Sequence, residues 1–223
     1  NGRLPVFFFL LSMKNQQTIM QFPKAVMIVP PIFIHGIIFI FFIDTIGKII
    51  GRRAAKELRV DDIVNIGIGI PEMVSRYARK SGMLDMVTLT VESGGIGGFP
   101  VSGEAFGAMI GAASVYDMAN QFDLYDNGGL DICFMGALEV DQYGNINAHR
   151  GPGAFAGIGG FANITAKTPT VVFCMSFNAK GLTVSQKSGE ITIEKEGSVP
   201  KFVEHVNLSL IHISEPTRQA EIS

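Results

Sequence analysis

The chain has 223 residues, of which 47% are hydrophobic and 17% are charged, and its formal net charge is -2. This length fits one or two domains with a large apolar core, and the weak negative charge without a basic cluster argues against a nucleic-acid-binding protein. Two cysteines, Cys133 and Cys174, each lie in an apolar run, which predicts buried thiols in a reducing compartment, not a disulfide framework or a metal site.

Residues 1–43 differ in character from the rest of the chain. They contain no acidic residue and hold eight of the 17 phenylalanines, and residues 25–43 carry no formal charge, a length that can cross a bilayer. Pro30 and Pro31 would interrupt such a helix. A secretory signal fits poorly, because the apolar stretch starts late and no small-residue cleavage site follows. A membrane anchor is one interpretation; we favour a non-native or misjoined segment, because the character changes abruptly at Asp44.

From residue 44 onward the pattern alternates between helices and strands. Apolar residues at helical spacing predict a helix over residues 45–59, and a second helix is expected over 72–80, just after Pro71. Short apolar and β-branched runs predict strands at 63–66 and 86–90. This alternation indicates an α/β fold, with an open and mostly parallel sheet flanked by helices. Everything in this region has the character of a cytoplasmic protein.

The second half of the chain continues the alternation. We expect a helix around residues 111–120 and strands at 131–135 and 170–175. Runs at 182–186 and 191–194 flank a short polar turn, which is typical of a β-hairpin.

The most informative stretch is the end of the strand predicted at 86–90. A single carboxylate, Glu92, follows it, and four glycines occupy positions 94, 95, 97 and 98. Ligands of open α/β sheets bind beyond the carboxyl ends of the strands, and glycines let a ligand approach the main chain closely. Glu92 is therefore a candidate for covalent catalysis. The alternative is a strand-end glutamate that caps a turn.

Other possible sites are weaker. The glycines at 67–69 lack the third glycine of the dinucleotide fingerprint, and those at 157–159 have neither a convincing preceding strand nor a nearby acidic residue for a ribose. His149 has no evident nucleophile partner and is interpreted as a loop histidine. No metal ligand set is apparent.

Residues 208–223 resemble the conceptual translation of a transposase adapter used in sequencing libraries. We therefore expect this tail to derive from such an adapter, with the natural chain continuing differently after Asn207. The alternative is an ordinary polar C-terminal tail. His212 is assigned no function for this reason.

Six ordered motifs carry a resemblance to family I coenzyme A-transferases, and the propionate/acetate CoA-transferase type, which fuses both halves in one chain, is the most similar. The resemblance covers the first part of the β-type half, so residues 44–207 are interpreted as an incomplete β-type domain of the three-layer CoA-transferase/isomerase-like fold. The motifs are NIGIGIP at 65–71, TVESG at 90–94, QFDLYD at 121–126, GGLD at 128–131, GNIN at 144–147 and GIGGFANI at 157–164.

The resemblance implies a function and a site. Glu92 matches the glutamate that forms a glutamyl-CoA thioester during ping-pong transfer of coenzyme A between a short-chain acyl-CoA and a free carboxylate. Gly160, with its neighbour Gly159, matches the position that donates a backbone N–H to an oxyanion, and Gly94 is expected to help clear space for the thioester arm. Coenzyme A is then a substrate, and no cofactor or metal is expected. The expected partners are acyl-CoA, short-chain carboxylates, the missing α-type half and further copies in a homo-oligomer.

Two other classes of function stay open at this point. A non-catalytic ligand-binding or regulatory α/β module would tolerate Glu92→Gln without loss of function. A membrane-anchored protein would need residues 1–43, and comparing the detergent-free solubility of a chain starting at Asp44 with that of the full chain would test this case.

Overall fold

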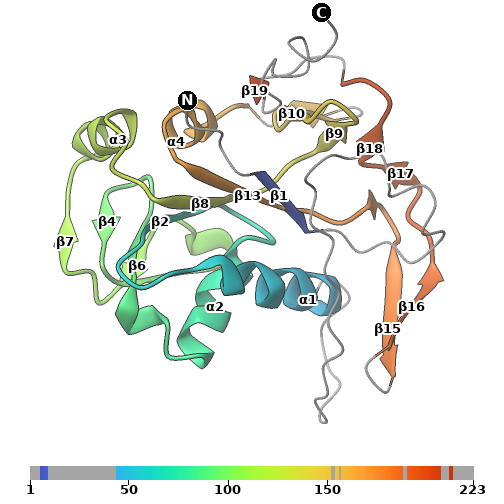
Figure 1. The fold of residues 1–223 in the computed structure, drawn as a ribbon, viewed down its shortest axis with the longest axis horizontal. Helices are drawn as coiled ribbons and strands as arrows, with labels where there is room; N and C mark the ends of the chain where they lie inside the picture. The colour runs from blue at the N-terminus through green and yellow to red at the C-terminus, as the bar shows by residue number, and fades with distance from the viewer. Residues whose placement is uncertain are drawn as a thin grey trace, which may run out of the picture.

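The computed structural model describes residues 6–9, 44–151, 154–155, 157–187, 190–206 and 211–212. Within these ranges, a seven-stranded sheet forms the centre of the molecule (Figure 1). Its first five strands run parallel and the last two pair antiparallel, so the prediction of a mostly parallel sheet is confirmed. In spatial order the strands are β1 (Val6–Phe9), β13 (Thr170–Cys174), β8 (Ile132–Met135), β2 (Ile63–Ile66), β3 (Thr88–Thr90), β4 (Gly95–Ile96) and β7 (Ser114–Val115).

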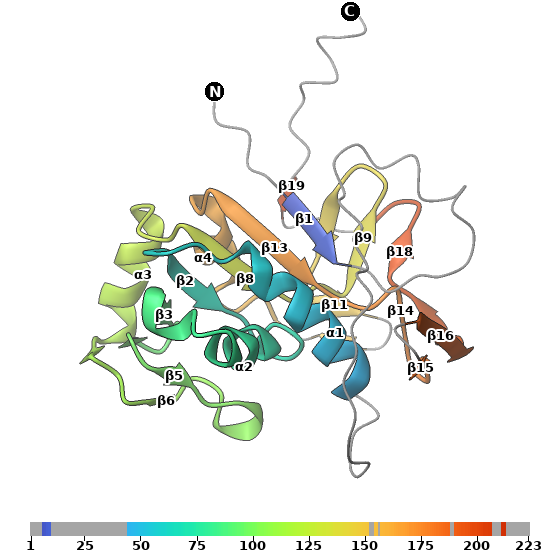
Figure 2. The same cartoon turned by 60° about the horizontal axis from the view of Figure 1, so that its bottom comes forward.

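Helices cover both faces of this sheet, which makes three layers (Figures 1 and 2). One face carries α1 (Asp44–Ala54), extended by the 3₁₀ turn η1 (Ala55–Glu57), and α2 (Glu72–Lys80). The other face carries α3 (Met118–Asp126) and α4 (Phe161–Ala166). Two buried apolar clusters follow from this arrangement, one between each helical layer and the sheet. All four residues of β8 are buried, as expected for a parallel strand covered on both sides.

Smaller elements lie beside the main sheet. Strands β18, β9, β10 and β19 form a four-stranded sheet, and Figure 1 places it on the same side of the main sheet as α4. The remaining strands form two-stranded pairs. The bounds are β5 (Phe99–Pro100) with β6 (Met109–Ile110), β9 (Glu139–Asp141), β10 (Asn145–Asn147), β11 (Arg150–Gly151) with β12 (Ala154–Phe155), β14 (Asn178–Ala179) with β17 (Val199–Pro200), β15 (Thr183–Lys187) with β16 (Glu190–Lys195), β18 (Phe202–Val203) and β19 (Ile211–His212), with 3₁₀ turns η2 (Leu84–Met86) and η3 (Gly103–Ala105).

Most predicted elements are confirmed. The helices expected at 45–59 and 72–80 are α1 with η1 and α2, and the hairpin expected late in the chain is β15–β16. The strand expected at 86–90 is shorter, because residues 84–86 form η2 and β3 begins at Thr88.

The helix expected around residues 111–120 is wrong. Gly111 has a φ of +66°, and Ser114 pairs with Ile96 in the antiparallel part of the sheet, so the chain is extended there. Helix α3 starts only at Met118, because the Asp117 side chain caps it by accepting a hydrogen bond from the Asn120 amide at 2.8 Å. The predicted helix therefore begins several residues too early, and only its last part, from Met118, is helical.

The predicted boundaries at both ends fall largely outside the described residues. Of residues 1–43, Val6–Phe9 pairs with β13 at the edge of the main sheet, and of residues 208–223, Ile211–His212 pairs with β10. The apolar stretch 25–43 and residues 213–223 lie outside the described residues, so the interpretations of both segments stay predictions. Where the structure describes the chain, it contains no helix of the length and apolarity needed to span a bilayer.

Candidate functional site

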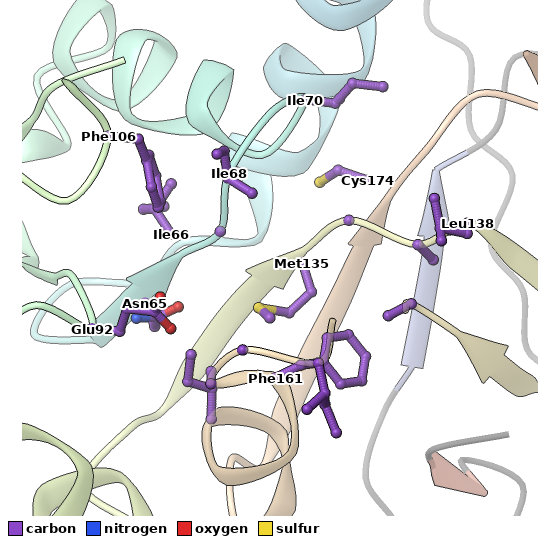
Figure 3. Close-up of a pocket in the computed structure, with 18 of the residues that line it drawn as sticks. Asn65, Ile66, Ile68, Ile70, Glu92, Phe106, Met135, Leu138, Phe161 and Cys174 are labelled. Atoms are coloured by element: carbon purple, nitrogen blue, oxygen red, sulfur yellow. The ribbon is translucent and has the colours of Figure 1, made fainter. Parts of the chain in front are cut away.

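A pocket of about 440 Å³ opens at the carboxyl ends of the parallel strands (Figure 3). Strands β2, β3, β8 and β13 all end at this edge, so the loops that follow them and the start of α4 form the wall. The residues that line it are Asn65, Ile66, Gly67, Ile68, Ile70, Glu92, Phe106, Met135, Gly136, Ala137, Leu138, Ala148, Gly157, Ile158, Gly159, Gly160, Phe161, Ile164, Cys174 and Lys201.

Glu92 lies in this pocket, two residues beyond the end of β3. A tight turn presents it, in which the Gly94 amide donates to the Val91 carbonyl at 3.0 Å and the Val91 amide donates to the Gly95 carbonyl at 3.1 Å. The Glu92 side chain is half-buried. Figure 3 shows it at the β2 end of the pocket, together with Asn65. The sequence prediction thus placed the carboxylate at the correct edge of the sheet, and no described contact makes it the cap of its own turn.

Gly160 directly adjoins Glu92. A Cβ atom built on Gly160 would overlap the Oε2 oxygen of Glu92 and would lie 2.7 Å from Cζ of Phe122. Gly160 precedes the first turn of α4, and its carbonyl accepts the Ile164 amide at 3.0 Å. Its neighbour Gly159 also lines the pocket and has a φ of +52°. The structure therefore brings together Glu92, Gly159 and Gly160, although they are widely separated in sequence.

Gly94 lies close to the main chain of Tyr116. It is not among the pocket-lining residues, and a Cβ there would overlap the Tyr116 carbonyl oxygen and lie 2.8 Å from the Tyr116 carbonyl carbon. Its φ of +109° also favours glycine. Gly98 similarly lies close to the Ile110 carbonyl oxygen, 2.6 Å from a built Cβ. These glycines allow close pairing of short strands, and the role of Gly94 in clearing space for the thioester arm stays a prediction.

A fully buried hydrogen-bond network lies around Tyr125. The Tyr125 hydroxyl accepts from Asn65 Nδ2 at 3.1 Å and from Gln121 Nε2 at 2.7 Å, and it donates to Thr90 Oγ1 at 3.0 Å. Thr90 in turn donates to the Val64 carbonyl at 3.0 Å. The network joins β2, β3 and α3 just below the turn that carries Glu92.

This network is electrostatically coupled to the pocket. Burial is the main cause that raises the pKa of Tyr125, and the negative charge of Glu92 raises it further. Among the described residues, Asn65 Oδ1 and Gln121 Oε1 accept no hydrogen bond. Because Asn65 also lines the pocket, it belongs both to the buried network and to the pocket wall.

Glu72 holds two loops of the site together. Its Oε1 oxygen accepts the Gly69 amide at 2.7 Å, and its Oε2 oxygen accepts the Gly103 amide at 3.1 Å. The first loop follows β2 along the pocket wall, and the second leads to Phe106, which lines the pocket. The Ser93 hydroxyl donates to the Gly107 carbonyl and fixes the same segment from the other side.

Charged groups in the pocket wall are few. Of the lining residues, Glu92 and Lys201 are the two that carry a charge near neutral pH. Lys201 Nζ donates to the Ala137 carbonyl oxygen at 2.9 Å, and burial lowers the pKa of this ammonium.

Of the other residues that the sequence singled out, Cys174 lines the pocket, whereas His149 and Cys133 do not. His149 is buried between β10 and β11 and does not line the pocket. Cys133 and Cys174 form no disulfide and are buried, and burial raises the pKa of both thiols. Within the described ranges, no group of three His, Cys, Asp or Glu side chains is placed to hold a metal ion.

Several site residues were not assigned a role from the sequence. The sequence did contain a signal for Asn65, because a side-chain amide inside the apolar strand Ile63–Ile66 needs a buried hydrogen-bond partner. Gln121 and Tyr125 are spaced by one helical turn inside a motif that carried the resemblance, but no local pattern indicates that they meet Asn65. Lys201 and Phe106 reach the pocket through loops, and sequence periodicity gives no signal for such residues.

Comparisons with known proteins agree on one family. Residues 48–206 match the model of the family described as coenzyme A transferase. Acetate CoA-transferase YdiF of Escherichia coli (strain K12) is 40% identical over 156 residues, which cover 70% of this chain and 29% of that protein. Caffeate CoA-transferase of Acetobacterium woodii is 42% identical over 164 residues, 71% of this chain and 31% of that protein.

A shorter relative and a solved structure complete the comparison. Acetate CoA-transferase subunit beta of E. coli (strain K12) is 33% identical over 167 residues, which cover 70% of this chain and 72% of the subunit. The crystal structure of acyl-CoA transferase YdiF from E. coli O157:H7, as a thioester complex with CoA, superimposes with a TM-score of 0.70 at 35% identity. It is covered to 31%, and this chain to 75%. The chain thus spans about 30% of the length of the first relatives it matches.

Proposed function

Because the chain belongs to the coenzyme A transferase family, we propose that it carries the glutamate nucleophile of an enzyme that transfers coenzyme A between an acyl-CoA and a free carboxylate. The observation that carries this proposal is the position of Glu92, which lies in the pocket at the carboxyl edge of the sheet and directly adjoins Gly160. Coenzyme A is a substrate in this reaction and not a bound cofactor.

The proposed reaction has two half-reactions with Glu92 as the carrier. The Glu92 carboxylate attacks the thioester carbonyl of the acyl-CoA, and the CoA thiolate leaves, which gives a mixed anhydride between Glu92 and the acyl group. The thiolate then attacks the Glu92 carbonyl and releases the first acid, which leaves a glutamyl-CoA thioester. A second carboxylate reverses these steps and departs as the new acyl-CoA. No net proton transfer is needed, because carboxylate and thiolate exchange places throughout.

Each tetrahedral intermediate carries an oxyanion that needs a hydrogen-bond donor. Among the described residues, the Gly160 amide donates no hydrogen bond. It lies beside the Glu92 carboxylate, where the charge of two of the intermediates would develop. A donor of this kind contributes on the order of 10²–10³ in rate. We therefore assign the Gly160 amide as an oxyanion donor, with Gly159 holding the turn before it.

The proposal extends to the rest of the enzyme. The chain covers 72% of a protein named as a beta subunit and under a third of the longer relatives, which supports a separate α-type half that completes the active site. We propose short-chain carboxylic acids as substrates, a homo-oligomeric assembly of the complete enzyme and a cytoplasmic location. The two buried thiols that form no disulfide fit a reducing compartment.

Mass spectrometry tests the central step. The chain is combined with the α-type half from the same gene, incubated with acetyl-CoA and digested, and the peptide that contains Glu92 is examined for the mass of bound CoA. We expect the adduct in the unaltered protein and its loss in Glu92→Gln. Asp85→Asn is the matched control, because Asp85 is an exposed carboxylate on η2 outside the pocket wall. Transfer activity without any adduct at Glu92, or activity retained by Glu92→Gln, would contradict the proposal.

A further inference from the structure

Lys201 enters the pocket from the side of the molecule opposite Glu92. It lies between β17 and β18, whereas Glu92 follows β3, and Figure 2 shows β3 toward the left of the molecule and β18 at its right. Both residues nevertheless line the same pocket. The Lys201 side chain is half-buried, and its Nζ donates to the Ala137 carbonyl just beyond the end of β8.

The positive charge of Lys201 has no counter-charge in the described part of the chain. No described carboxylate forms an ion pair with it, and the bond to Ala137 uses one of the three donors of its ammonium group. Burial lowers the pKa of Lys201, which reflects the cost of holding this ammonium group partly away from water. A partly desolvated ammonium without a counter-ion is costly, and a bound anion would remove that cost.

Among the described lining residues, Lys201 is the one cation that an anion can meet. Apart from Glu92 and Lys201, the pocket is lined by apolar side chains, glycines and one amide, Asn65. An anionic ligand that enters this pocket therefore gains most from contact with Lys201, because electrostatic attraction is strong where water is scarce.

We propose that Lys201 binds an anionic oxygen group, a carboxylate or a phosphate, inside the pocket that Glu92 lines. The proposed function enters this proposal at one point: it names the two possible sources of the anionic group, the free carboxylic acid and the phosphates of coenzyme A. Lys201 is thus a binding residue that determines the charge of the accepted ligand, whereas Glu92 performs the chemistry.

A purely structural role is the competing explanation, because the bond from Lys201 to Ala137 ties the β17–β18 turn to β8. Two variants separate the roles. Lys201→Gln keeps a side-chain donor for the Ala137 carbonyl but removes the charge, and Lys201→Met removes both while it keeps the apolar stem. Lys56→Met is the matched control, because Lys56 is exposed on η1 and does not line the pocket, so it removes one positive charge elsewhere.

Calorimetric titrations of the full 223-residue chain with acetate, coenzyme A and pantetheine test the proposal. Pantetheine carries the thiol arm without phosphates or carboxylate. We expect Lys201→Gln and Lys201→Met to weaken binding of one anion roughly tenfold to a hundredfold, since a hydrogen bond to a charged group is lost, and to leave pantetheine binding unchanged. A loss confined to acetate identifies a carboxylate site, and a loss confined to coenzyme A identifies a phosphate site.

Two outcomes would overturn the proposal: equal anion binding by Lys201→Gln and the unaltered chain, or no binding of either anion by the unaltered chain. The adduct measurement at Glu92 is made on the same variants after the α-type half is added. An intact adduct with unchanged anion binding rejects the role of Lys201 alone. A missing adduct in the unaltered protein, together with anion binding that depends on Lys201, rejects the proposed chemistry alone.

Discussion

Gly160 and Glu92 approach so closely that a single methyl group on Gly160 would overlap the Glu92 carboxylate. The same methyl group would also collide with the Phe122 ring, because Cζ of Phe122 lies 2.7 Å from the built Cβ atom. Any larger residue at position 160 therefore has to displace the Glu92 or Phe122 side chain, whereas its φ of -79° is open to every residue type.

Gly160→Ala should displace the Glu92 carboxylate while the fold persists. A shift of about 1 Å at a reacting group can cost on the order of 10²-fold in rate, so we expect a loss of that size in adduct formation at Glu92. Gly47→Ala is the control, because its new Cβ would meet only Met73 Cγ at an ordinary 3.7 Å inside α1. It should keep full activity and raise the free energy of unfolding by about 1 kcal/mol. Normal adduct formation in Gly160→Ala would show that Glu92 has room to move.

Tyr125→Phe should destabilise the protein. The change removes the oxygen that accepts hydrogen bonds from Asn65 and Gln121, and it leaves two buried amide groups without an acceptor. The expected loss is about 1–3 kcal/mol in the free energy of unfolding, measured by urea denaturation. Tyr116→Phe, at an exposed tyrosine, should change it by no more than about 0.5 kcal/mol. Equal stabilities of the two variants would mean that the network contributes nothing measurable.

Glu72→Gln should loosen the loop that leads to Phe106. The glutamine amide can accept only one of the two backbone amides that the Glu72 carboxylate holds, at Gly69 and Gly103. We expect hydrogen exchange at one of these amides to accelerate several-fold, which corresponds to about 1 kcal/mol. The Gly97 amide, which donates to Leu89 at 2.8 Å, is the internal reference and should keep its protection. Unchanged exchange at both Glu72 partners would argue against the proposed clamp.

The half-buried ammonium of Lys201 should make stability depend on alkaline pH. Its pKa is lowered in the folded protein, so between that lowered value and the usual value the unfolded chain binds more protons than the folded one. The free energy of unfolding therefore contains an electrostatic cost at neutral pH that disappears as the pH rises through this window. Urea denaturation across the window should show a smaller rise in Lys201→Met than in the unaltered chain. Parallel pH profiles would indicate that the ammonium is well solvated.

The sheet was predictable because its signals are local. Each buried parallel strand is a short apolar run, as in the fully buried strand Ile132–Met135, and each flanking helix has its own periodicity. The start of α3 was not predictable by composition, because one side chain, Asp117, decides it. Glu92 was found because a lone carboxylate between a strand and a glycine cluster is unusual.

The rest of the site depends on tertiary contacts. Tyr125 meets Asn65 across two layers of the fold, and no spacing rule relates the two. In the sequence, the glycines after Glu92 could equally make space for a ligand or allow short strands to pair closely. The neighbours of each glycine, such as Tyr116 beside Gly94, are known only from the structure. Lys201 lies in the short link between β17 and β18, far along the chain from Glu92. In the sequence it looks like an ordinary surface lysine.

The wall of the pocket is built from chain segments that lie far apart in the sequence and are therefore synthesised at different times. Glu92 precedes Lys201 in the chain, and Lys201, which closes the opposite wall, emerges only with the last described strands. A nascent polypeptide that has passed β3 but not β18 thus exposes its carboxylate to water without the enclosure that would select a ligand. Enclosure of the pocket therefore depends on a segment that folds onto the sheet from far along the chain.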